Sequence, residues 1–275
     1  MGSSFNRRNI DHVLQSNLFA LAYELAETAR KAILPLFRTN SLETINKDSH
    51  GFDPVTRADK AAEKAIREIL AQKRPEDGIL GEEYANIDSK SGLTWVLDPI
   101  DGTRSFISGT PTWGVLIALA DADGPFLGVV DQPFIGERFA GGFGKATSVG
   151  PQGEQALSTR GLKDLSEAIL FTTFPEIGRD QDYAGFRAVH DQVKLVRYGL
   201  DCYAYALLAA GHIDLVIEAG LQPYDIQAPI ALIEAAGGIV TNWKGAPAHL
   251  GGQVIAASNK QLLDQALAFL TPYAD

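Results

Sequence analysis

The sequence contains very little cysteine. Cys202 is the only one among 275 residues, so no disulfide can form within the chain, and a reducing, cytoplasmic setting is expected. No histidine lies close to Cys202 in the sequence, which favours a buried apolar role for this thiol over a nucleophilic one.

Long apolar runs and basic clusters are also missing. No run reaches the ~18 apolar residues that a membrane-spanning helix needs. The opening stretch MGSSFNRRNIDH has no apolar segment after its arginines, so no export signal is expected. The formal net charge of -10, with no offsetting Lys/Arg cluster, argues against a nucleic-acid partner. The five histidines lack zinc-like spacing.

The composition suits a globular chain with a substantial core, at 45% hydrophobic and 21% charged residues. Apolar residues recur at helical spacing from Asp11 to Phe37 and from Thr56 to Leu70, which predicts two long amphipathic helices separated by the polar, turn-forming residues 45–55. Short apolar runs then predict a mainly antiparallel sheet, with strands at 78–81, 94–97, 113–121, 125–133 and 137–144.

After about Leu157 predicted strands and helices alternate, which is typical of a layered α/β unit. The change of pattern predicts an N-terminal α+β part at 1–157 and a C-terminal α/β part at 158–275. The expected strands of the second part are 168–174, 194–199, 213–220, 237–243 and 253–258, and its expected helices are 183–193, 202–210, 225–236 and 260–270.

The stretch WVLDPIDGT, from Trp95 to Thr103, ends an apolar run with two nearby aspartates. Taken alone, the segment from Asp98 to Gly102 has the composition of a turn. Pro99 fixes its own φ and can bring both carboxylates to one side, where they would repel each other unless a positive charge lay between them. With the carbonyl oxygen of Ile100, three oxygens would converge on a hard cation such as Mg²⁺.

Other residues fit the same chemistry, each with an alternative. Glu82 and Glu83 follow an apolar run and are either ligands or a solvated pair before a loop. Asp225 begins an apolar helix, where Asp is a favoured N-cap. Gly102 and Thr103 offer backbone N–H groups that attract phosphate oxygens at a helix start. A cation site beside an anion cradle indicates phosphoryl chemistry.

These motifs resemble the inositol monophosphatase superfamily of Mg²⁺-dependent, lithium-sensitive phosphomonoesterases. The resemblance rests on GEE (81–83), WVLDPIDGT (95–103) and PYDIQAPIALIEAAGG (223–238). Within the superfamily, DGTRSFISG, LDCYAYALLAAG and EAGLQPYDI are most similar to the histidinol-phosphate phosphatase branch. The inositol branch more often has Thr-Asn after DGT and Trp before the last metal-binding Asp, where this sequence has Arg104-Ser105 and Tyr224.

The resemblance implies a layered α-β-α-β-α sandwich, usually dimeric, that holds two or three Mg²⁺ ions. It implies that Glu82, Asp98 and the Ile100 carbonyl hold the first metal. Asp98, Asp101 and Asp225 would hold the second, with Asp98 bridging. Most of the ligands then lie in the N-terminal part, and the last one lies in the C-terminal part.

The resemblance also assigns catalytic roles. Asp59 would work with Thr103 to orient and deprotonate a metal-bound water, with Glu82 also in the catalytic set. The N–H groups of Gly102 and Thr103 would hold phosphate oxygens. For Asp59 the alternative is a first-turn Asp favoured by the helix dipole.

Asp201, Glu218 and Arg104 are predicted to contact the substrate. The alternatives are an N-cap for Asp201 and a solvated strand-end acid for Glu218. If both acids line the pocket, their charge favours a cationic substrate, which predicts hydrolysis of L-histidinol phosphate to L-histidinol and phosphate. The alternatives are an inositol-1-phosphate or broader sugar-phosphate phosphatase and, in another class, a metal-dependent phosphate-binding module without turnover.

Overall fold

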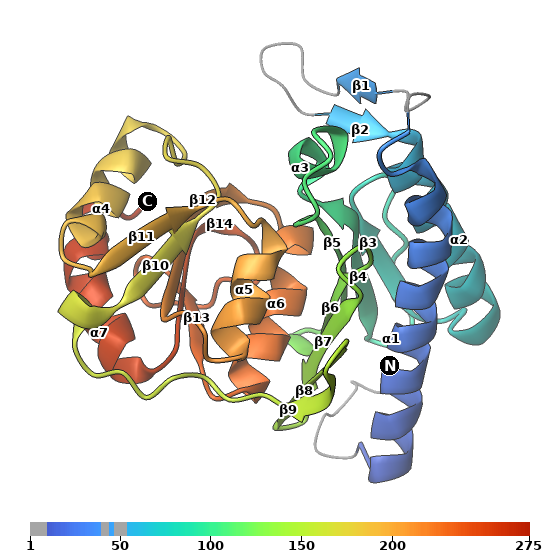
Figure 1. Cartoon of the computed structure of the whole chain (residues 1–275). Helices are drawn as coiled ribbons and strands as arrows, with labels where there is room; N and C mark the ends of the chain where they lie inside the picture. Colours follow the sequence, from blue (N-terminus) through green and yellow to red (C-terminus); the bar gives the residue numbers. More distant parts are fainter. Residues whose placement is uncertain (1–9, 40–43, 47–53) are drawn as a thin grey trace.

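The computed structural model describes residues 10–39, 44–46 and 54–275 (Figure 1). The opening residues 1–9 and most of the predicted turn-forming stretch 45–55 therefore lie outside the described residues. Two short strands, β1 (Thr44–Asn46) and β2 (Pro54–Thr56), pair antiparallel. Within the described ranges, no helix combines the length and apolarity that crossing a bilayer requires.

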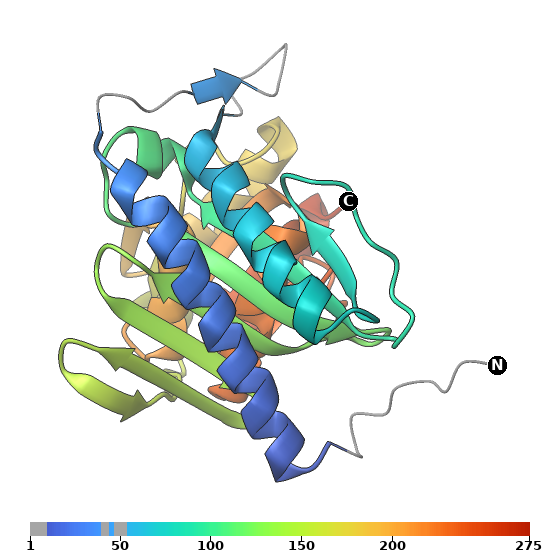
Figure 2. The same ribbon diagram turned by 90° about the vertical axis from the view of Figure 1, so that its right-hand side faces the viewer.

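Both long N-terminal helices are confirmed. Helix α1 (His12–Ile33) begins after Asp11, whose side chain accepts the N–H of Leu14. A short 3₁₀ turn (Leu34–Leu36), which contains Pro35, follows its end. Helix α2 (Arg57–Lys73) begins after Thr56. The two helices lie side by side over one face of the first sheet (Figure 2).

The first sheet has seven strands in the order β3-β4-β5-β6-β7-β8-β9. Only β3 and β4 pair in parallel, so the expectation of a mainly antiparallel sheet is confirmed. The last two strands were not predicted, because β9 is fully exposed and β8 lacks an apolar alternation. The strands are β3 (Gly78–Gly81), β4 (Thr94–Asp101), β5 (Gly114–Asp121), β6 (Gly124–Gln132), β7 (Glu137–Gly142), β8 (Lys145–Gly150) and β9 (Gly153–Ala156).

The second sheet has five strands in the order β11-β10-β12-β14-β13, parallel across β11, β10 and β12 and antiparallel at β14. All of its strands were predicted within a few residues. They are β10 (Ile169–Thr172), β11 (Leu195–Tyr198), β12 (Leu215–Leu221), β13 (Ile239–Asn242) and β14 (Gly252–Ala257), and the remaining helices are α3 (Thr103–Ile107), α4 (Asp180–His190), α5 (Cys202–Ala209), α6 (Pro223–Ala235) and α7 (Lys260–Leu270).

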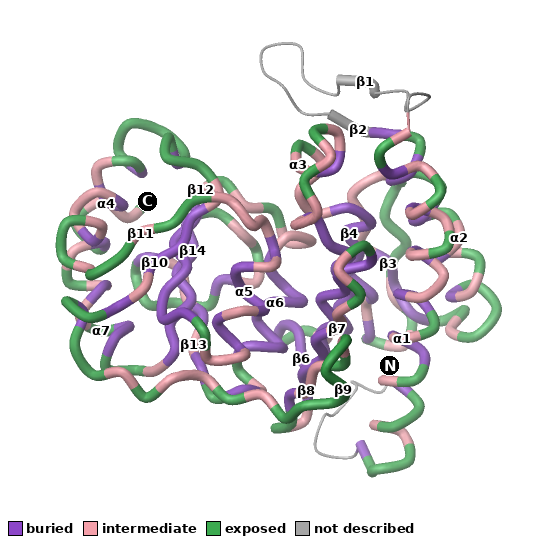
Figure 3. Tube along the Cα trace, in the orientation of Figure 1, coloured by how far each residue is buried: buried purple, intermediate pink, exposed green. Residues whose placement is uncertain are grey.

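The elements form five layers. Helices α1 and α2 cover the outer face of the first sheet, α5 and α6 lie between the two sheets, and α4 and α7 cover the far face of the second (Figures 1 and 3). Successive residues of β4 alternate between cores: Trp95 and Leu97 pack under α1 and α2, and Val96 packs toward α5 and α6. Burial on both faces explains the continuous apolar runs and confirms the predicted α-β-α-β-α sandwich.

The predicted division at Leu157 stays a prediction. The first sheet ends at Ala156 and the second begins at Ile169. However, α5 and α6, which follow the division in the sequence, pack against the first sheet. The line between the two parts therefore runs through a shared helical layer, and the candidate site lies where the ends of β4 and β12 meet the beginnings of α3, α5 and α6.

Candidate active site

A bulge in β4 places Asp98 and Asp101 together. Asp98 pairs with Leu116 and Asp101 pairs with Gly114, so three steps along β4 match two along β5. Residues three apart on a regular strand point to opposite faces. The extra residue of the bulge restores the same face for both aspartates. The chain therefore does not leave the strand at Pro99, as its turn-like composition suggested; β4 continues to Asp101.

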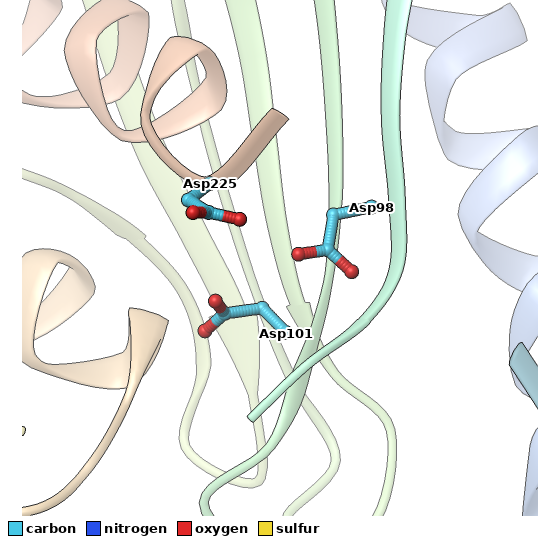
Figure 4. Close-up of side chains that lie close together, drawn as sticks. All are labelled: Asp98, Asp101 and Asp225. Atoms are coloured by element: carbon cyan, nitrogen blue, oxygen red, sulfur yellow. The ribbon is translucent and has the colours of Figure 1, made fainter. Parts of the chain in front are cut away.

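Asp225 completes a cluster of three carboxylates with Asp98 and Asp101. One ligand oxygen from each lies within 4.8 Å of the others (Figure 4). Helix α6 begins at Pro223, two residues before the predicted start, so Asp225 is its third residue and Gln222 is the N-cap. Asp225 Oδ2 accepts the Gln222 N–H at 2.7 Å. Asp225 thus stabilises the helix start and belongs to the acidic cluster at once.

The cluster is costly without a cation. Burial raises the pKa of Asp98 well above its usual range, and the neighbouring Glu82 carboxylate raises it further. The pKa of Asp101 is also raised well above its usual range, mainly by burial and secondly by the negative charge of Asp201. A divalent ion would favour the ionised forms, and carboxylate and carbonyl oxygens are the donors that hard cations such as Mg²⁺ take. The residues present therefore fit a divalent metal ion.

Glu82 and Ile100 lie beside this cluster. Glu82 follows β3 and lines the same cavity as Asp98. Its side chain is close enough to Asp98 to share a hydrogen bond that raises the pKa of Asp98. The Ile100 side chain is buried in the core, and its carbonyl accepts the Thr103 hydroxyl at 3.1 Å.

Asp59 lies in the first turn of α2 and faces Thr103, and its catalytic role stays a prediction. It is fully buried in the first turn of α2, where Oδ2 accepts the backbone N–H of Thr56 at 2.9 Å and its hydroxyl at 2.5 Å. The other oxygen, Oδ1, lies 3.5 Å from Thr103 Oγ1. One carboxylate therefore caps the helix and also faces the threonine of the DGT motif.

Asp201 does not cap α5. It stands at the N-cap position, but its side chain makes no capping hydrogen bond. It accepts instead from Ser105 Oγ at 2.6 Å and Thr112 Oγ1 at 3.3 Å. The backbone N–H of Cys202, at the start of the helix, donates a hydrogen bond to Asp101 Oδ2 at 2.5 Å. Asp201 therefore occupies the N-cap position, as the alternative had it, but its side chain does not cap the helix.

Glu218 is buried rather than solvated. Only 7% of the residue is exposed, and its carboxylate accepts three hydrogen bonds from the end of β10: from the Thr173 N–H at 2.7 Å, the Thr173 hydroxyl at 2.8 Å and the Thr172 hydroxyl at 3.2 Å. Burial raises the pKa of Glu218 to about 7, although these hydrogen bonds oppose the shift.

The acidic cluster, Glu82, Asp201 and Glu218 line one cavity of about 480 Å³, a size typical of small-molecule sites, and Asp59 is not among its lining residues. Arg104 lines it and lies over the ring of Phe174 at 5.0 Å. Cys202 also lines it and is buried, as predicted. The predicted residues in the lining are Glu82, Asp98, Ile100, Asp101, Gly102, Thr103, Arg104, Asp201, Glu218 and Asp225.

Sequence reasoning missed six lining residues: Thr173, Phe174, Tyr205, Ala219, Gly220 and Leu221. Thr173 and Phe174 follow β10, the parallel neighbour of β12, and the carboxyl ends of parallel strands meet at one edge of a sheet. Tyr205 lies one helical turn after Asp201, hence on the same face of α5. It is 4% exposed, and its hydroxyl has no hydrogen-bond partner within the described part of the chain.

The arrangement suits phosphoryl transfer. It combines an acidic cluster that fits a divalent cation, the backbone of Gly102 and Thr103 beside it, and a buried carboxylate that faces a hydroxyl. Catalysis of this type depends mainly on positioning and charge stabilisation.

Comparisons with known proteins agree. The pattern of the Inositol monophosphatase family matches residues 14–272. The bifunctional phosphatase IMPL2 of Arabidopsis thaliana is 39% identical, over 98% of this chain and 82% of that protein. A histidinol-phosphatase of Chlorobaculum parvum is 34% identical, over 88% of this chain and 92% of that protein.

Among solved structures, an inositol monophosphatase from Zymomonas mobilis superposes with a TM-score of 0.82 at 39% identity, covering 93% of this chain and 98% of that one. The family match at residues 14–272 includes both sheets and the three aspartates of the acidic cluster. The alternative of a binding module without turnover is therefore set aside: the chain is a phosphatase and belongs to the inositol monophosphatase family.

Proposed function

We propose that this phosphatase hydrolyses L-histidinol phosphate to L-histidinol and phosphate. The observation that carries the proposal is the presence of two carboxylates, the partly buried Asp201 and the buried Glu218, in the lining of the cavity outside the three-aspartate cluster. Histidinol phosphate carries an ammonium and an imidazole beyond its phosphate. These cationic groups compensate the buried acids, whereas the neutral hydroxyls of a polyol do not.

The proposed metal is Mg²⁺, with two or three ions in the site. Glu82, Asp98 and the carbonyl of Ile100 would hold the first ion. Asp98, Asp101 and Asp225 would hold the second, with Asp98 shared. When bound, such ions lower the pKa of a water and stabilise the departing alkoxide.

The protein's own groups do the positioning. The N–H groups of Gly102 and Thr103 hold non-bridging phosphate oxygens. Asp59 Oδ1 takes the proton of the Thr103 hydroxyl, whose oxygen then accepts a proton from the attacking water. Arg104, stacked on Phe174, contacts the substrate from the same wall of the cavity.

Inositol-1-phosphate is the second candidate substrate. It is favoured by the Zymomonas mobilis structure, which is described as an inositol monophosphatase and shares 39% identity with this chain. The relatives named histidinol-phosphatase, from Chlorobaculum parvum and Mycobacterium tuberculosis, support the first candidate at 34% identity each.

Substitution of the two acids separates the candidates. Asp201→Ala and Glu218→Ala should each lower kcat/KM for histidinol phosphate at least ~10-fold, about 1.4 kcal/mol. A small uncharged phosphomonoester should lose less. Glu154→Ala, in the exposed strand β9, serves as the control and should change neither. Equal losses on both substrates would contradict the cationic-substrate proposal.

We also propose a cytoplasmic homodimer. The buried, unpaired thiol of Cys202 suits a reducing compartment, and the family resemblance supports the dimer. Light scattering of the purified protein tests the dimer, because a monomer mass at micromolar concentration would contradict it.

A further inference from the structure

A buried ion pair on α2 lies outside the acidic cluster. Glu63 is fully buried, and Arg67, one turn later, donates from Nε to Glu63 Oε1 at 2.7 Å. The two side chains are 0% and 14% exposed. Desolvating such a pair is expensive and usually adds little net stability, so the hydrogen bonds that it makes to other parts of the chain indicate what it does.

Both members of the pair bind the backbone that follows Glu82. Glu63 Oε2 accepts the N–H of Glu83 at 2.8 Å. Arg67 donates to the carbonyls of Tyr84 at 3.1 Å and Ala85 at 3.0 Å. Three consecutive residues after Glu82 are thus bound to one turn of α2.

Gly81, the residue before Glu82, packs against the Glu63 carboxylate. A Cβ at Gly81 would lie 2.1 Å from Glu63 Oε1, a distance that real Cβ atoms do not show. Glycine at this position lets the Glu63 carboxylate lie directly against the backbone at the end of β3. The main chain is therefore held on both sides of Glu82, and the Glu82 side chain projects from a fixed point.

Helix α2 also carries Asp59, which lies one turn before Glu63 and faces Thr103. Tyr84 adds a further link from the segment to this helix, since its hydroxyl donates to the carbonyl of Lys60 at 3.2 Å. One rigid helix thereby sets the backbone of Glu82 relative to the carboxylate of Asp59.

We propose that Glu63 and Arg67 are positioning residues that hold Glu82 in the geometry needed for metal binding. The inference rests on the proposed function, in which Glu82 is a metal ligand. It assigns the pair to metal affinity rather than to contact with the phosphomonoester. Second-layer partners of metal ligands typically influence affinity in this way.

Binding of Mn²⁺ to the substrate-free protein, followed by calorimetry and by electron paramagnetic resonance, tests the proposal without relying on turnover. Glu63→Ala should raise the Kd for Mn²⁺ about 10-fold or more. Arg67→Lys keeps the charge opposite Glu63 but loses the fork that reaches two carbonyls, so it should also weaken Mn²⁺ binding. At saturating Mg²⁺, KM for the phosphomonoester should stay within about 2-fold of wild type in both variants.

Arg74→Ala is the matched control. Arg74, just past the end of α2, pairs with the buried Asp77 at 2.6 Å, and Asp77 also accepts from Trp95 at 3.0 Å. Its loss should lower the melting temperature and leave the Kd for Mn²⁺ unchanged.

Glu82→Gln separates the positioning role of Glu63 and Arg67 from the assignment of Glu82 as a metal ligand. Weaker Mn²⁺ binding in Glu82→Gln, Glu63→Ala and Arg67→Lys, but not in Arg74→Ala, supports the proposal. Weaker binding in Glu82→Gln alone overturns the positioning role and leaves Glu82 as a ligand. Unchanged binding in Glu82→Gln overturns the ligand assignment and the inference with it. If Glu63→Ala does not fold, Arg67→Lys decides alone.

Discussion

A Cβ at Gly102 would lie 2.6 Å from the carboxylate carbon of Asp201. Gly102 also has φ +84°, in the left-handed region that disfavours other residues. Position 102 therefore requires glycine for two reasons: its backbone conformation, and the Asp201 side chain packed against it. The second constraint links the proposed phosphate cradle to the proposed substrate acid.

Gly102→Ala should reduce both stability and activity. The reference is Gly136→Ala, which has the same φ of +84° and nothing within 4 Å of its added Cβ. Backbone strain alone should cost Gly136→Ala about 1 kcal/mol in urea unfolding and leave kcat intact. Gly102→Ala should cost more and lower kcat at least ~10-fold by displacing Asp201 and the N–H groups beside it. Matching effects of the two variants would show that the Asp201 contact is unimportant.

Asp98→Asn should lower kcat by at least ~100-fold, because it removes a ligand that both ions are proposed to share. In EDTA at pH 8 the variant should be more stable than wild type. Burial and the Glu82 carboxylate raise the pKa of Asp98, so the ionised Asp98 destabilises the metal-free fold, and the substitution removes that charge. Thermal unfolding and steady-state kinetics measure the two effects. Activity within a few fold of wild type would exclude the bridging role.

Asp59→Asn should lower kcat and largely spare the affinities for metal and phosphate, because it removes the acceptor that faces Thr103. Thr56→Val separates this role from helix capping. It removes the hydroxyl bound to Asp59 Oδ2 and should cost about 1 kcal/mol of stability without a comparable loss of kcat. A collapse of metal affinity in Asp59→Asn with kcat preserved would show that the assignment is wrong.

Glu218→Gln should change how stability depends on pH. Burial raises the pKa of Glu218 from 4.5 to about 7, so the folded chain keeps this proton after the unfolded chain has lost it. Stability should therefore fall as pH rises from about 4.5 to about 7, by roughly 3 kcal/mol from this group alone. The Gln variant should lack that loss.

Urea unfolding of the metal-free protein at pH 5 and pH 8 compares the two chains. Wild type and Glu218→Gln should be similar at pH 5, and the variant should be the more stable of the two at pH 8. The amide can replace the carboxylate's contacts, since its oxygen accepts from Thr173 and its NH₂ donates to the Thr172 hydroxyl. An equal difference at both pH values would exclude a raised pKa as the cause.

Much of the fold was predictable because most elements have an apolar face. The strand at 78–81 and the helix at 260–270 have the predicted bounds. Strand β9 carries no such signal, since all four of its residues are exposed. The short helix α3 was not predicted as an element of its own; the sequence indicated only a helix start at Gly102 and Thr103, after a segment with turn composition.

The acids were predictable from motifs, but their environments were not. Nothing in the local sequence shows that β4 bulges between Asp98 and Asp101, because the extra residue is defined by pairing with β5. An N-cap was the alternative for Asp201, and its hydrogen bond from Ser105, 96 residues earlier in the chain, could not be read from the local sequence. The buried hydroxyl of Tyr205 likewise depends on contacts between distant segments.

The substrate is tested most directly by comparing kcat/KM for L-histidinol phosphate and inositol-1-phosphate, measured on the wild-type enzyme with saturating Mg²⁺. The cavity acids Asp201 and Glu218 predict a preference for histidinol phosphate of at least ~10-fold, about 1.4 kcal/mol in transition-state binding. Equal values, or a preference for inositol-1-phosphate, would contradict the account.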